Sequence, residues 1–252
     1  MRVVLVTSQC MYVKDNYYSM IKKIADKNNL PHGTSICGVV FVKTVSFSLL
    51  LKALYLMVIG VRSLSLTLIC NMISSIFLDR RKKLFKSLGV PVLLVDDINN
   101  PEVVMKIKNL CPDIIVNLRT RNIYKKEILQ VPGIGCINIH HGLLPENRGT
   151  MCDLWAWYEG RPVGFSVHWM NEKIDDGHIL KIKEIDISNI KKYTDIPMIS
   201  SIYEAECLLE CMDKISREGW FKTLDNKNEK VRFTRNPTMQ EIRKMLKKGL
   251  KL

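Results

Sequence analysis

The sequence predicts an α/β fold with a mostly parallel, doubly wound sheet in a chain of 252 residues. Short runs rich in Val and Ile recur along the chain, as they do in strands that are buried on both faces. Segments with apolar residues at helical spacing separate these runs, which is the alternation that crossover helices produce. The hydrophobic fraction of 47% is enough for a buried core and argues against a disordered chain.

The first half of the chain contains three predicted strands with helices between them. The strands are expected over 2–7, 35–44 and 89–97, and the first helix presents Tyr17, Met20, Ile21 and Ile24 on one face. Asn100 as a cap and Pro101 at the first helical position begin a further helix. The residues of that helix expected to face inward are Val104, Ile107 and Cys111.

Further elements follow in the same order. Strands are expected over 111–118, 133–140 and 164–170 and within 171–187, and helices over 123–130 and 150–160. A long helix then carries an apolar stripe, consisting of Ile202, Ala205, Leu208, Leu209, Met212 and Ile215. A short terminal helix opens with a capping box from Thr238 to Glu241. We expect one compact domain over 1–220 and a basic C-terminal extension over 221–252.

The segment 46–78 is expected to be an apolar helical insertion. Its uncharged stretches, 53–61 and 63–78, fall short of the roughly 18 residues that a spanning helix needs. One interpretation, which we favour, is helices buried in the core, in a hairpin over the sheet, or against a second subunit in a homodimer. The alternative is an interfacial segment that contacts a membrane through 46–83, with the basic run 80–83 resting on anionic lipid.

Composition narrows the class of partner and the compartment. The eight cysteines include no C-x-x-C pair and most lie in apolar runs, which predicts reduced thiols, a cytoplasmic protein and no metal site. The apolar run after Arg2 is far too short for a secretory signal. The net charge of +13 predicts an acidic partner, which would be a phosphorylated substrate, a nucleic acid or an anionic membrane.

The stretch INIHHGLLPENRG, residues 137–149, places polar groups at the end of a predicted strand. Asn138 and His140 are two residues apart, so their side chains share one face of the strand. In a doubly wound sheet, ligands bind beyond the carboxyl ends of strands. A carboxamide can donate to a developing oxyanion and an imidazole can donate or move a proton, which suits chemistry at a carbonyl group. Asp175 and Asp176, in a turn downstream, offer the carboxylate that an imidazole needs.

Together with GRPVGFSVHWMNEKIDDGHIL, residues 160–180, this stretch resembles the core signature of the tetrahydrofolate-dependent formyltransferases. That family includes phosphoribosylglycinamide, methionyl-tRNA and amino-sugar N-formyltransferases. The matching residues occur in the family's order: Asn138, His140, Leu143, Leu144, Pro145, Gly149, Gly164, Ser166, His168, Asp175 and Gly177. The resemblance covers roughly residues 90–182 and implies a single Rossmann-like formyltransferase domain with a short C-terminal helical extension.

The resemblance also implies roles for individual residues. Asn138, His140 and Asp175 would be catalytic, whereas Asp176 fills a variable position of the family's pattern. The donor, 10-formyltetrahydrofolate, would be bordered by Leu143, Leu144, Pro145, Gly149 and Gly177. Three arginines are candidates for binding anionic groups: Arg119, Arg121 and Arg148. For Arg148 the alternative is that it braces the loop. His141 and His178 are expected in loops, and His168 as a supporting group.

The expected function is transfer of a formyl group to a primary amine of a small, phosphorylated acceptor. An amino-sugar nucleotide is the leading acceptor and glycinamide ribonucleotide the second. The part after Asp175 is expected to be too short for the β-barrel domain of the tRNA enzyme, so no specific nucleic-acid partner is expected. The alternatives are a hydrolase of the same donor and a relic that binds membrane or RNA without catalysis.

Overall fold

A computed structural model describes residues 1–221, 223–228 and 230–252; Lys222 and Glu229, both in the expected extension, lie outside the described residues. A seven-stranded sheet in the order β3-β2-β1-β4-β5-β7-β8 forms the centre. Its strands are β1 (Arg2–Ser8), β2 (Ser35–Val42), β3 (Val92–Val95), β4 (Ile114–Leu118), β5 (Gly135–His140), β7 (Val163–Trp169) and β8 (Ile179–Ile185). The first five strands in this order are parallel. β7 runs antiparallel to both of its neighbours, so β8 points in the same direction as the first five. The predicted mostly parallel α/β fold is therefore confirmed.

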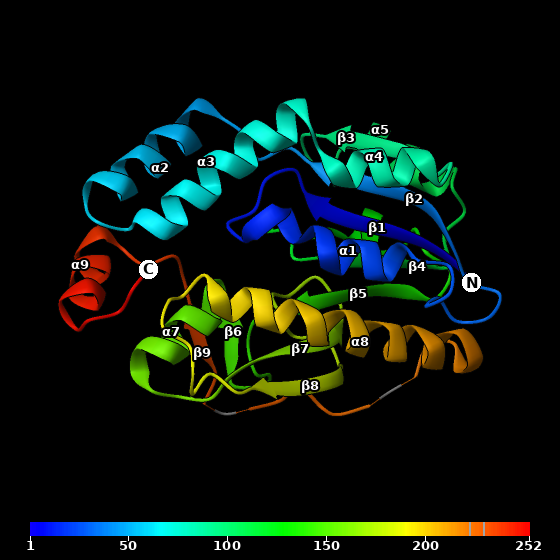
Figure 1. Cartoon of the computed structure of the whole chain (residues 1–252). Coiled ribbons are helices and arrows are strands. Elements are labelled where there is room, and N and C mark those ends of the chain that lie inside the picture. Colours follow the sequence, from blue (N-terminus) through cyan, green and yellow to red (C-terminus); the bar gives the residue numbers. More distant parts are fainter. Residues whose placement is uncertain (222, 229) are drawn as a thin grey trace.

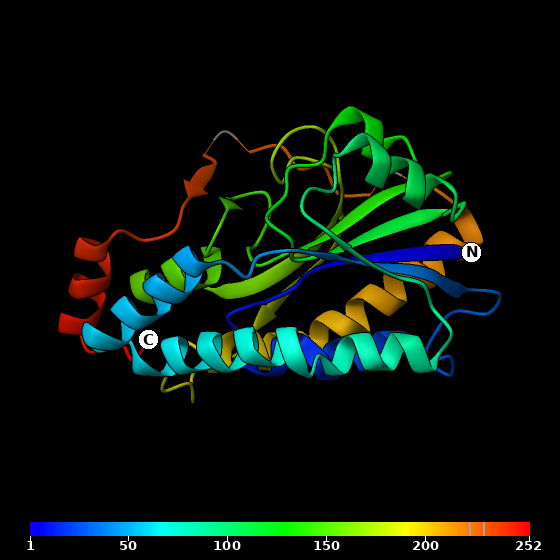
Figure 2. The ribbon, with the colours of Figure 1, turned by 90° about the horizontal axis from the view of Figure 1, so that it is seen from above.

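Helices cover both faces of the sheet (Figures 1 and 2). Val3 and Leu5 of β1 join one buried cluster, with residues of α1 (Tyr18–Ala25), α4 (Arg80–Ser87) and α8 (Asp195–Glu218). Val4 and Val6 join the other cluster, with residues of α5 (Pro101–Lys108) and α6 (Lys126–Leu129). Successive side chains of a strand point to opposite faces, so one apolar run supplies both cores.

Two predicted apolar faces differ in detail from the structure. The side chain of Asn100 caps α5 by accepting a hydrogen bond from the Glu102 N–H, as expected. The fully buried residues of that helix are Val103 and Ile107, whereas Val104 is only partly buried and Cys111 is exposed. Cys111 does not face inward because α5 ends at Lys108. On α8, Ile202 is 56% exposed and Leu209 is only partly buried, so the buried side, which already includes Ile196, does not contain these two residues.

The apolar insertion is a helical hairpin, α2 (Phe47–Val58) and α3 (Arg62–Phe77). It packs on the loop after β1, where the side-chain amide of Asn71 donates to the carbonyls of Met11 and Val13 at 2.8 and 2.7 Å. The segment is therefore a helical hairpin, but it packs on this loop and leaves many of its large apolar side chains exposed, so the expected burial over the sheet or in the core is wrong for these residues. Within the described residues, none of the helices has the length and apolar character needed to cross a membrane.

The C-terminal segment packs on the loops that follow β5. β6 (Asn147–Gly149) and β9 (Arg232–Thr234) form a parallel two-stranded sheet. The indole N–H of Trp155, in α7 (Cys152–Glu159), donates to the carbonyl of Arg235 at 2.7 Å. The predicted capping box opens α9 (Met239–Lys247). The extension therefore contacts the region that carries the polar motif.

A short 3₁₀ turn, η1 (Lys14–Tyr17), precedes α1.

Candidate active site

The polar motif lies at the carboxyl end of β5, as the sequence predicted. Asn138 is paired with His168 of β7, and His140 is paired with Ser166. Residues that are directly opposite in an antiparallel pair project to the same side of the sheet, which brings these side chains together. Asn138 and His140 are 9% and 6% exposed, so both side chains are nearly removed from water.

Asn138 is oriented by His168. The Nδ1–H of His168 donates to the carbonyl of Trp169 at 2.7 Å, which leaves its Nε2 unprotonated in the neutral ring. The side-chain amide of Asn138 donates one N–H to that Nε2 at 3.1 Å. Its second N–H remains for another acceptor, and its buried Oδ1 has no hydrogen-bond partner among the described residues. Asn138 thus offers both a donor and an acceptor to a bound molecule.

His140 lies between a carbonyl and a carboxylate. Its Nε2–H donates to the Asn147 carbonyl at 2.8 Å, and its Nδ1 lies 3.4 Å from Oδ2 of Asp175. Burial lowers the pKa of His140 below the ordinary value of 6.5, although the Asp175 carboxylate acts in the opposite direction. At neutral pH the ring is therefore neutral, with its proton on Nε2 and an unprotonated Nδ1 beside Asp175.

Asp175 is the carboxylate that the sequence assigned to His140. Besides Nδ1 of His140, its carboxylate contacts Nε2 of His168 at 3.6 Å and accepts the Gly149 N–H at 2.9 Å. Burial alone would raise the pKa of Asp175, but the positive charge that the two histidines carry when protonated and this N–H hold it well below its usual range. Asp175 is therefore ionised at neutral pH. The structure brings Asn138, His140 and Asp175 together around His168.

Asn226 holds the turn that carries Asp175, and sequence reasoning missed it. Its side-chain amide donates to the carbonyls of Asp175 and Gly177 at 2.9 and 2.8 Å, and the residue is 3% exposed. Asn226 lies in the C-terminal extension, 51 residues from Asp175. No local pattern in the sequence signals a pairing over that separation.

Arg148 makes the contacts of the loop-bracing alternative. Its guanidinium pairs with Oδ1 of Asp176 at 2.5 Å and donates to the Asn226 carbonyl at 2.5 Å. The side chain is 8% exposed, so these partners occupy it inside the loop cluster. Asp176 is thus a structural neighbour of Asp175 and contacts a different group. That Arg148 binds an anionic substrate group stays a prediction.

The residues expected to border the donor differ in accessibility. Leu143, Pro145 and Gly149 are partly exposed, whereas Leu144 is buried. A Cβ atom at Gly149 or Gly177 would overlap a backbone oxygen of the protein itself, Thr234 and Trp169 respectively. Packing within the protein therefore requires glycine at these two positions, whether or not a ligand binds there. Donor contact by all five residues stays a prediction.

The remaining polar candidates are divided between a buried network and the surface. Arg119 is 8% exposed, pairs with the buried Glu204 and lies over the Tyr17 ring. Burial lowers the pKa of Arg119 to about 9. His141 joins the same network, 3.1 Å from Glu204 and 3.3 Å from Asp153, and is not an isolated loop residue. Arg121 is exposed. Anion binding by either arginine stays a prediction, and the partners of Arg119 are internal.

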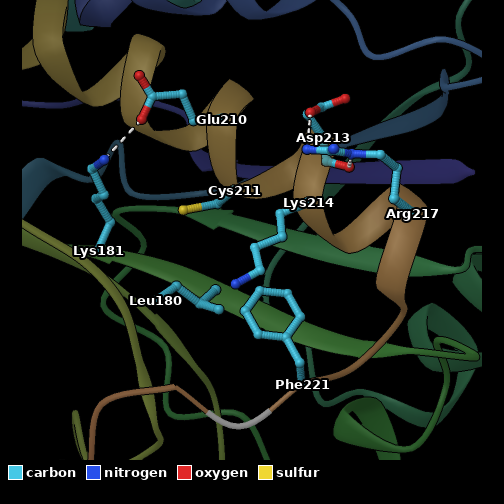
Figure 3. A pocket seen from close by; sticks show the side chains of 8 residues that line it. All are labelled: Leu180, Lys181, Glu210, Cys211, Asp213, Lys214, Arg217 and Phe221. Carbon is cyan, nitrogen blue, oxygen red and sulfur yellow. Dashed lines mark hydrogen bonds and ion pairs between the residues drawn. The ribbon is translucent and has the colours of Figure 1, made fainter.

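Two hollows lie on the described surface. One, of about 560 Å³, is lined in part by Arg148, Asp176 and Asn226 and so borders the Asp175 turn. The other, of about 350 Å³, lies between β8 and α8, away from Asn138, His140 and Asp175. Figure 3 shows four of its charged side chains as two pairs, Lys181 with Glu210 and Arg217 with Asp213, and Lys214 beside the Phe221 ring. The first hollow is therefore the one of these two that lies beside the candidate site.

The fold and the site define an α/β protein with a carboxamide, an imidazole and a carboxylate at the carboxyl edge of its sheet. The formyl transferase family matches residues 91–208, which contain all three side chains. Residues 91–208 therefore match the formyltransferase family, and the resemblance found in the motif is confirmed.

Curated relatives support the same family. A methionyl-tRNA formyltransferase of Thermodesulfovibrio yellowstonii is 31% identical over 137 residues, covering 54% of this chain and 44% of that protein. One of Bacillus cytotoxicus is 34% identical over 150 residues, covering 59% and 47%. The chain spans about half the length of the curated relatives it matches.

Solved structures show the same fold. A sugar N-formyltransferase from a Shewanella species covers 98% of this chain and 87% of its own, with a TM-score of 0.58 and 18% identity. A phosphoribosylglycinamide formyltransferase from Bacillus halodurans covers 86% of this chain and 96% of its own, with a TM-score of 0.61 and 16% identity. At these identities the likeness establishes the fold and does not identify an acceptor.

Proposed function

We propose that the chain transfers a formyl group from 10-formyltetrahydrofolate to a primary amine of a small, phosphorylated acceptor. The observation that carries the proposal is the arrangement of three buried groups in a formyltransferase-family domain. His140 Nδ1 lies 3.4 Å from the Asp175 carboxylate, and Asn138 has an N–H to spare. The reaction forms a bond between the acceptor nitrogen and the formyl carbon and breaks the bond between that carbon and the donor nitrogen.

Asn138 stabilises the oxyanion that develops on the formyl oxygen. One of its N–H groups is fixed on His168, which holds the amide plane and directs the second N–H. The unpartnered Oδ1 of Asn138, considered among the described residues, suits an incoming N–H of the amine or of the donor. The site therefore fits an amine and a formyl donor in one place, as this reaction requires.

His140 and Asp175 take the proton that the attacking amine loses. The unprotonated Nδ1 of His140 accepts it, and the adjacent carboxylate stabilises the resulting imidazolium. The proton that the leaving donor nitrogen gains can return by the same route. An imidazole N–H could in principle donate to the oxyanion as well, but the Nε2–H of His140 is already donated to the Asn147 carbonyl. Its role in this geometry is proton transfer.

An amino-sugar nucleotide is the acceptor class that we propose first. The net charge of +13 suits a phosphorylated acceptor. The structures named sugar N-formyltransferase from Shewanella and 4-N formyltransferase from Francisella tularensis align with 98% and 97% of this chain, including its C-terminal part. The proposal also places the protein in the cytoplasm, because all eight cysteines are free thiols.

A screen of amines with 10-formyltetrahydrofolate tests this function. The panel contains an amino-sugar nucleotide, glycinamide ribonucleotide and methionyl-tRNA, and the assay follows both the formylated amine and the free tetrahydrofolate. We expect equal amounts of both products with the amino-sugar nucleotide and neither product without an amine. Release of tetrahydrofolate at the same rate without an amine would identify a hydrolase. Product with only one of the other two amines would reassign the acceptor.

A further inference from the structure

The α2–α3 hairpin presents large apolar side chains to the solvent. Of the twenty large hydrophobic residues that are exposed in the described part of the chain, ten fall within residues 47–78. We call these ten the hairpin face: Phe47, Leu51, Leu54, Tyr55, Val58, Leu66, Ile73, Ile76, Phe77 and Leu78. Their exposed fractions run from 44% for Tyr55 to 82% for Val58.

The spacing of these residues gathers them on one side of each helix. In α2 the most exposed positions are 47, 51, 54 and 58, and in α3 they include 66, 73 and 77. Both series follow the three- and four-residue steps of a single helical stripe. Each stripe lies away from the side of its helix that packs on the protein.

The buried side of the hairpin includes several short or polar residues. Ala53, Ser65, Asn71 and Ser75 are at most 4% exposed. The Ser65 hydroxyl donates to the Ala53 carbonyl at 2.6 Å and joins the two helices. The Asn71 amide ties α3 to the loop after β1. The hairpin also buries Val61 and Met72, and its Leu56, Ile59 and Leu64 are partly buried against a core cluster. Ten of its large apolar side chains nevertheless face the solvent, which is unusual for a surface helix.

The hairpin face is too large to be an incidental surface. Its ten side chains leave on the order of 1,000 Å² exposed if a whole large side chain offers about 150–200 Å². The largest apolar patch of a typical monomer is about 300–600 Å², and larger patches mark a surface that another body covers. A patch of this size therefore indicates that another molecule or a membrane covers the hairpin face.

The charges around the face favour an anionic occupant. Residues 46–78 contain no Asp or Glu, and Lys52 and Arg62 on the hairpin are exposed. Lys83 of α4 and Lys247 of α9 are also exposed, and none of these four cations forms an ion pair within the described residues. Figures 1 and 2 show α9 beside the turn of the hairpin and α4 following α3 at its other end. Cations therefore flank the apolar face at both ends.

The expectation that the whole basic run 80–83 rests on lipid is wrong for Arg81. Arg81 is 1% exposed, its guanidinium donates to the carbonyls of Ser8 and Gln9, and it pairs with Asp79 at 2.9 Å. It holds α4 to the loop after β1 and is not available to a partner. Arg80 lies 4.0 Å from Asp15 and over the Tyr18 ring. Lys83 is the member of the run that faces solvent freely in the described structure.

We infer that the hairpin face docks on the surface of an anionic phospholipid membrane. Apolar side chains enter the boundary between headgroups and acyl chains, and Lys52, Arg62, Lys83 and Lys247 contact the acidic headgroups. A second copy of the chain fits less well. A two-fold contact through this face would gather the cations of both hairpins, and residues 46–78 supply no carboxylate to pair with them.

Flotation of the full chain with vesicles tests this inference and does not depend on catalysis. The probes are vesicles of phosphatidylcholine alone and of phosphatidylcholine with an equal part of phosphatidylglycerol. The chain should float with the anionic vesicles at low salt and much less with the neutral ones. The double variant Ile73→Gln/Ile76→Gln should bind at least about tenfold more weakly. Because the two side chains are 56% and 55% exposed, the fold should be retained, which circular dichroism checks.

The chain offers a matched control for these isoleucines. Ile123 and Ile202, at 57% and 56% exposure, lie outside the hairpin, so Ile123→Gln/Ile202→Gln should bind like the wild type. Lys52→Gln and Lys83→Gln should each weaken binding about fivefold. Equal losses in both isoleucine pairs, or no flotation at low salt, would overturn the inference. So would a wild-type dimer, measured by light scattering, that Ile73→Gln/Ile76→Gln converts to a monomer, since the occupant would then be a second copy.

Discussion

At the scale of single residues, the proposed chemistry depends on the positions of three protons, one on His140 and two on the side-chain amide of Asn138. The Nε2–H of His140 is committed to the Asn147 carbonyl, and one N–H of Asn138 is committed to His168. What remains is a free Asn138 N–H for an oxyanion and an unprotonated His140 Nδ1 beside Asp175 for a proton. Because Asn138 and His140 have separate roles, replacing each of them should have its own measurable effect on formyl transfer.

Asn138→Ala should slow formyl transfer by about 10² to 10³, because that is the usual cost of losing one oxyanion donor. His140→Ala should lose a similar factor through the missing proton acceptor, which typically contributes about 10² to 10⁴. The double variant should lose less than the product of the two factors, since both groups act on one transition state. Single-turnover rates measure these losses. A loss of secondary structure in either variant would assign the residue to folding instead.

The pH dependence follows from the lowered pKa of His140. Transfer needs the neutral ring, so the rate should hold as the pH falls past 6.5 and decline only near the lower pKa of the buried ring. In Asp175→Asn the carboxylate no longer raises that pKa, so the acidic decline should move to still lower pH while the maximum rate falls. A profile of kcat/KM against pH checks both statements. A decline that moves to higher pH would contradict this assignment.

The same pKa shift has a consequence for stability, and its sign can be stated. An unfolded chain binds a proton on His140 at the ordinary value of 6.5, above the value in the folded protein. Protonation therefore favours the unfolded chain, and stability from this group is lost as the pH falls from about 6.5 toward the folded pKa. Asp175 acts in the same direction at lower pH, because its folded pKa lies below its ordinary value of 3.8.

At the scale of elements, the Asp175 turn is held from three sides. Asn226 binds its carbonyls, Arg148 binds Asp176, and Gly177 lies against the backbone of Trp169. None of these contacts is made within the turn itself. The turn can therefore present a buried carboxylate in a left-handed backbone conformation, with φ of 49° at Asp175.

Gly177→Ala tests this packing. Its Cβ would overlap the Trp169 carbonyl, so we expect a loss of about 1–3 kcal/mol in the free energy of unfolding and a slower transfer rate. Gly133→Ala is the control, since its nearest neighbour lies 4.0 Å away and its φ is not left-handed; it should change stability by less than about 0.5 kcal/mol. Denaturant unfolding measures both variants. Equal free energies of unfolding for the two variants would contradict the tight packing of the turn at Gly177.

Elements were more predictable than the contacts between them. Strands β1, β4 and β5 and the motif at 137–149 are local patterns of apolar alternation and spacing, so the sequence was sufficient to place them. The role of Asn226 depends on a segment 51 residues away, and the inward direction of Arg119 depends on Glu204 of a distant helix. The hairpin was ambiguous for a different reason. Its large residues are apolar on the exposed side, and period alone does not say which side of a helix faces the protein.

At the scale of the whole molecule, the lysines and arginines behind the net charge of +13 are spread along the chain. α9 shows the usual pattern, in which Arg243, Lys244 and Lys247 are exposed while Ile242 and Met245 are buried. We therefore expect RNA binding that is weak, independent of sequence and steeply reduced by salt. Binding measured over a salt series checks this. Tight binding of a tRNA at physiological salt would contradict it and favour a tRNA acceptor.

The central claim is that the carboxylate of Asp175, and not that of its neighbour, belongs to the chemical centre. The most direct measurement compares formyl transfer by Asp175→Asn and Asp176→Asn, with donor binding measured separately. Asp175→Asn should lose at least about 10² in rate with little change in donor binding. Asp176→Asn weakens a pair with Arg148, so it should lose about 1–2 kcal/mol of stability and keep most of its rate. If Asp176→Asn abolishes transfer while Asp175→Asn does not, or if neither change matters, the account of this site is wrong.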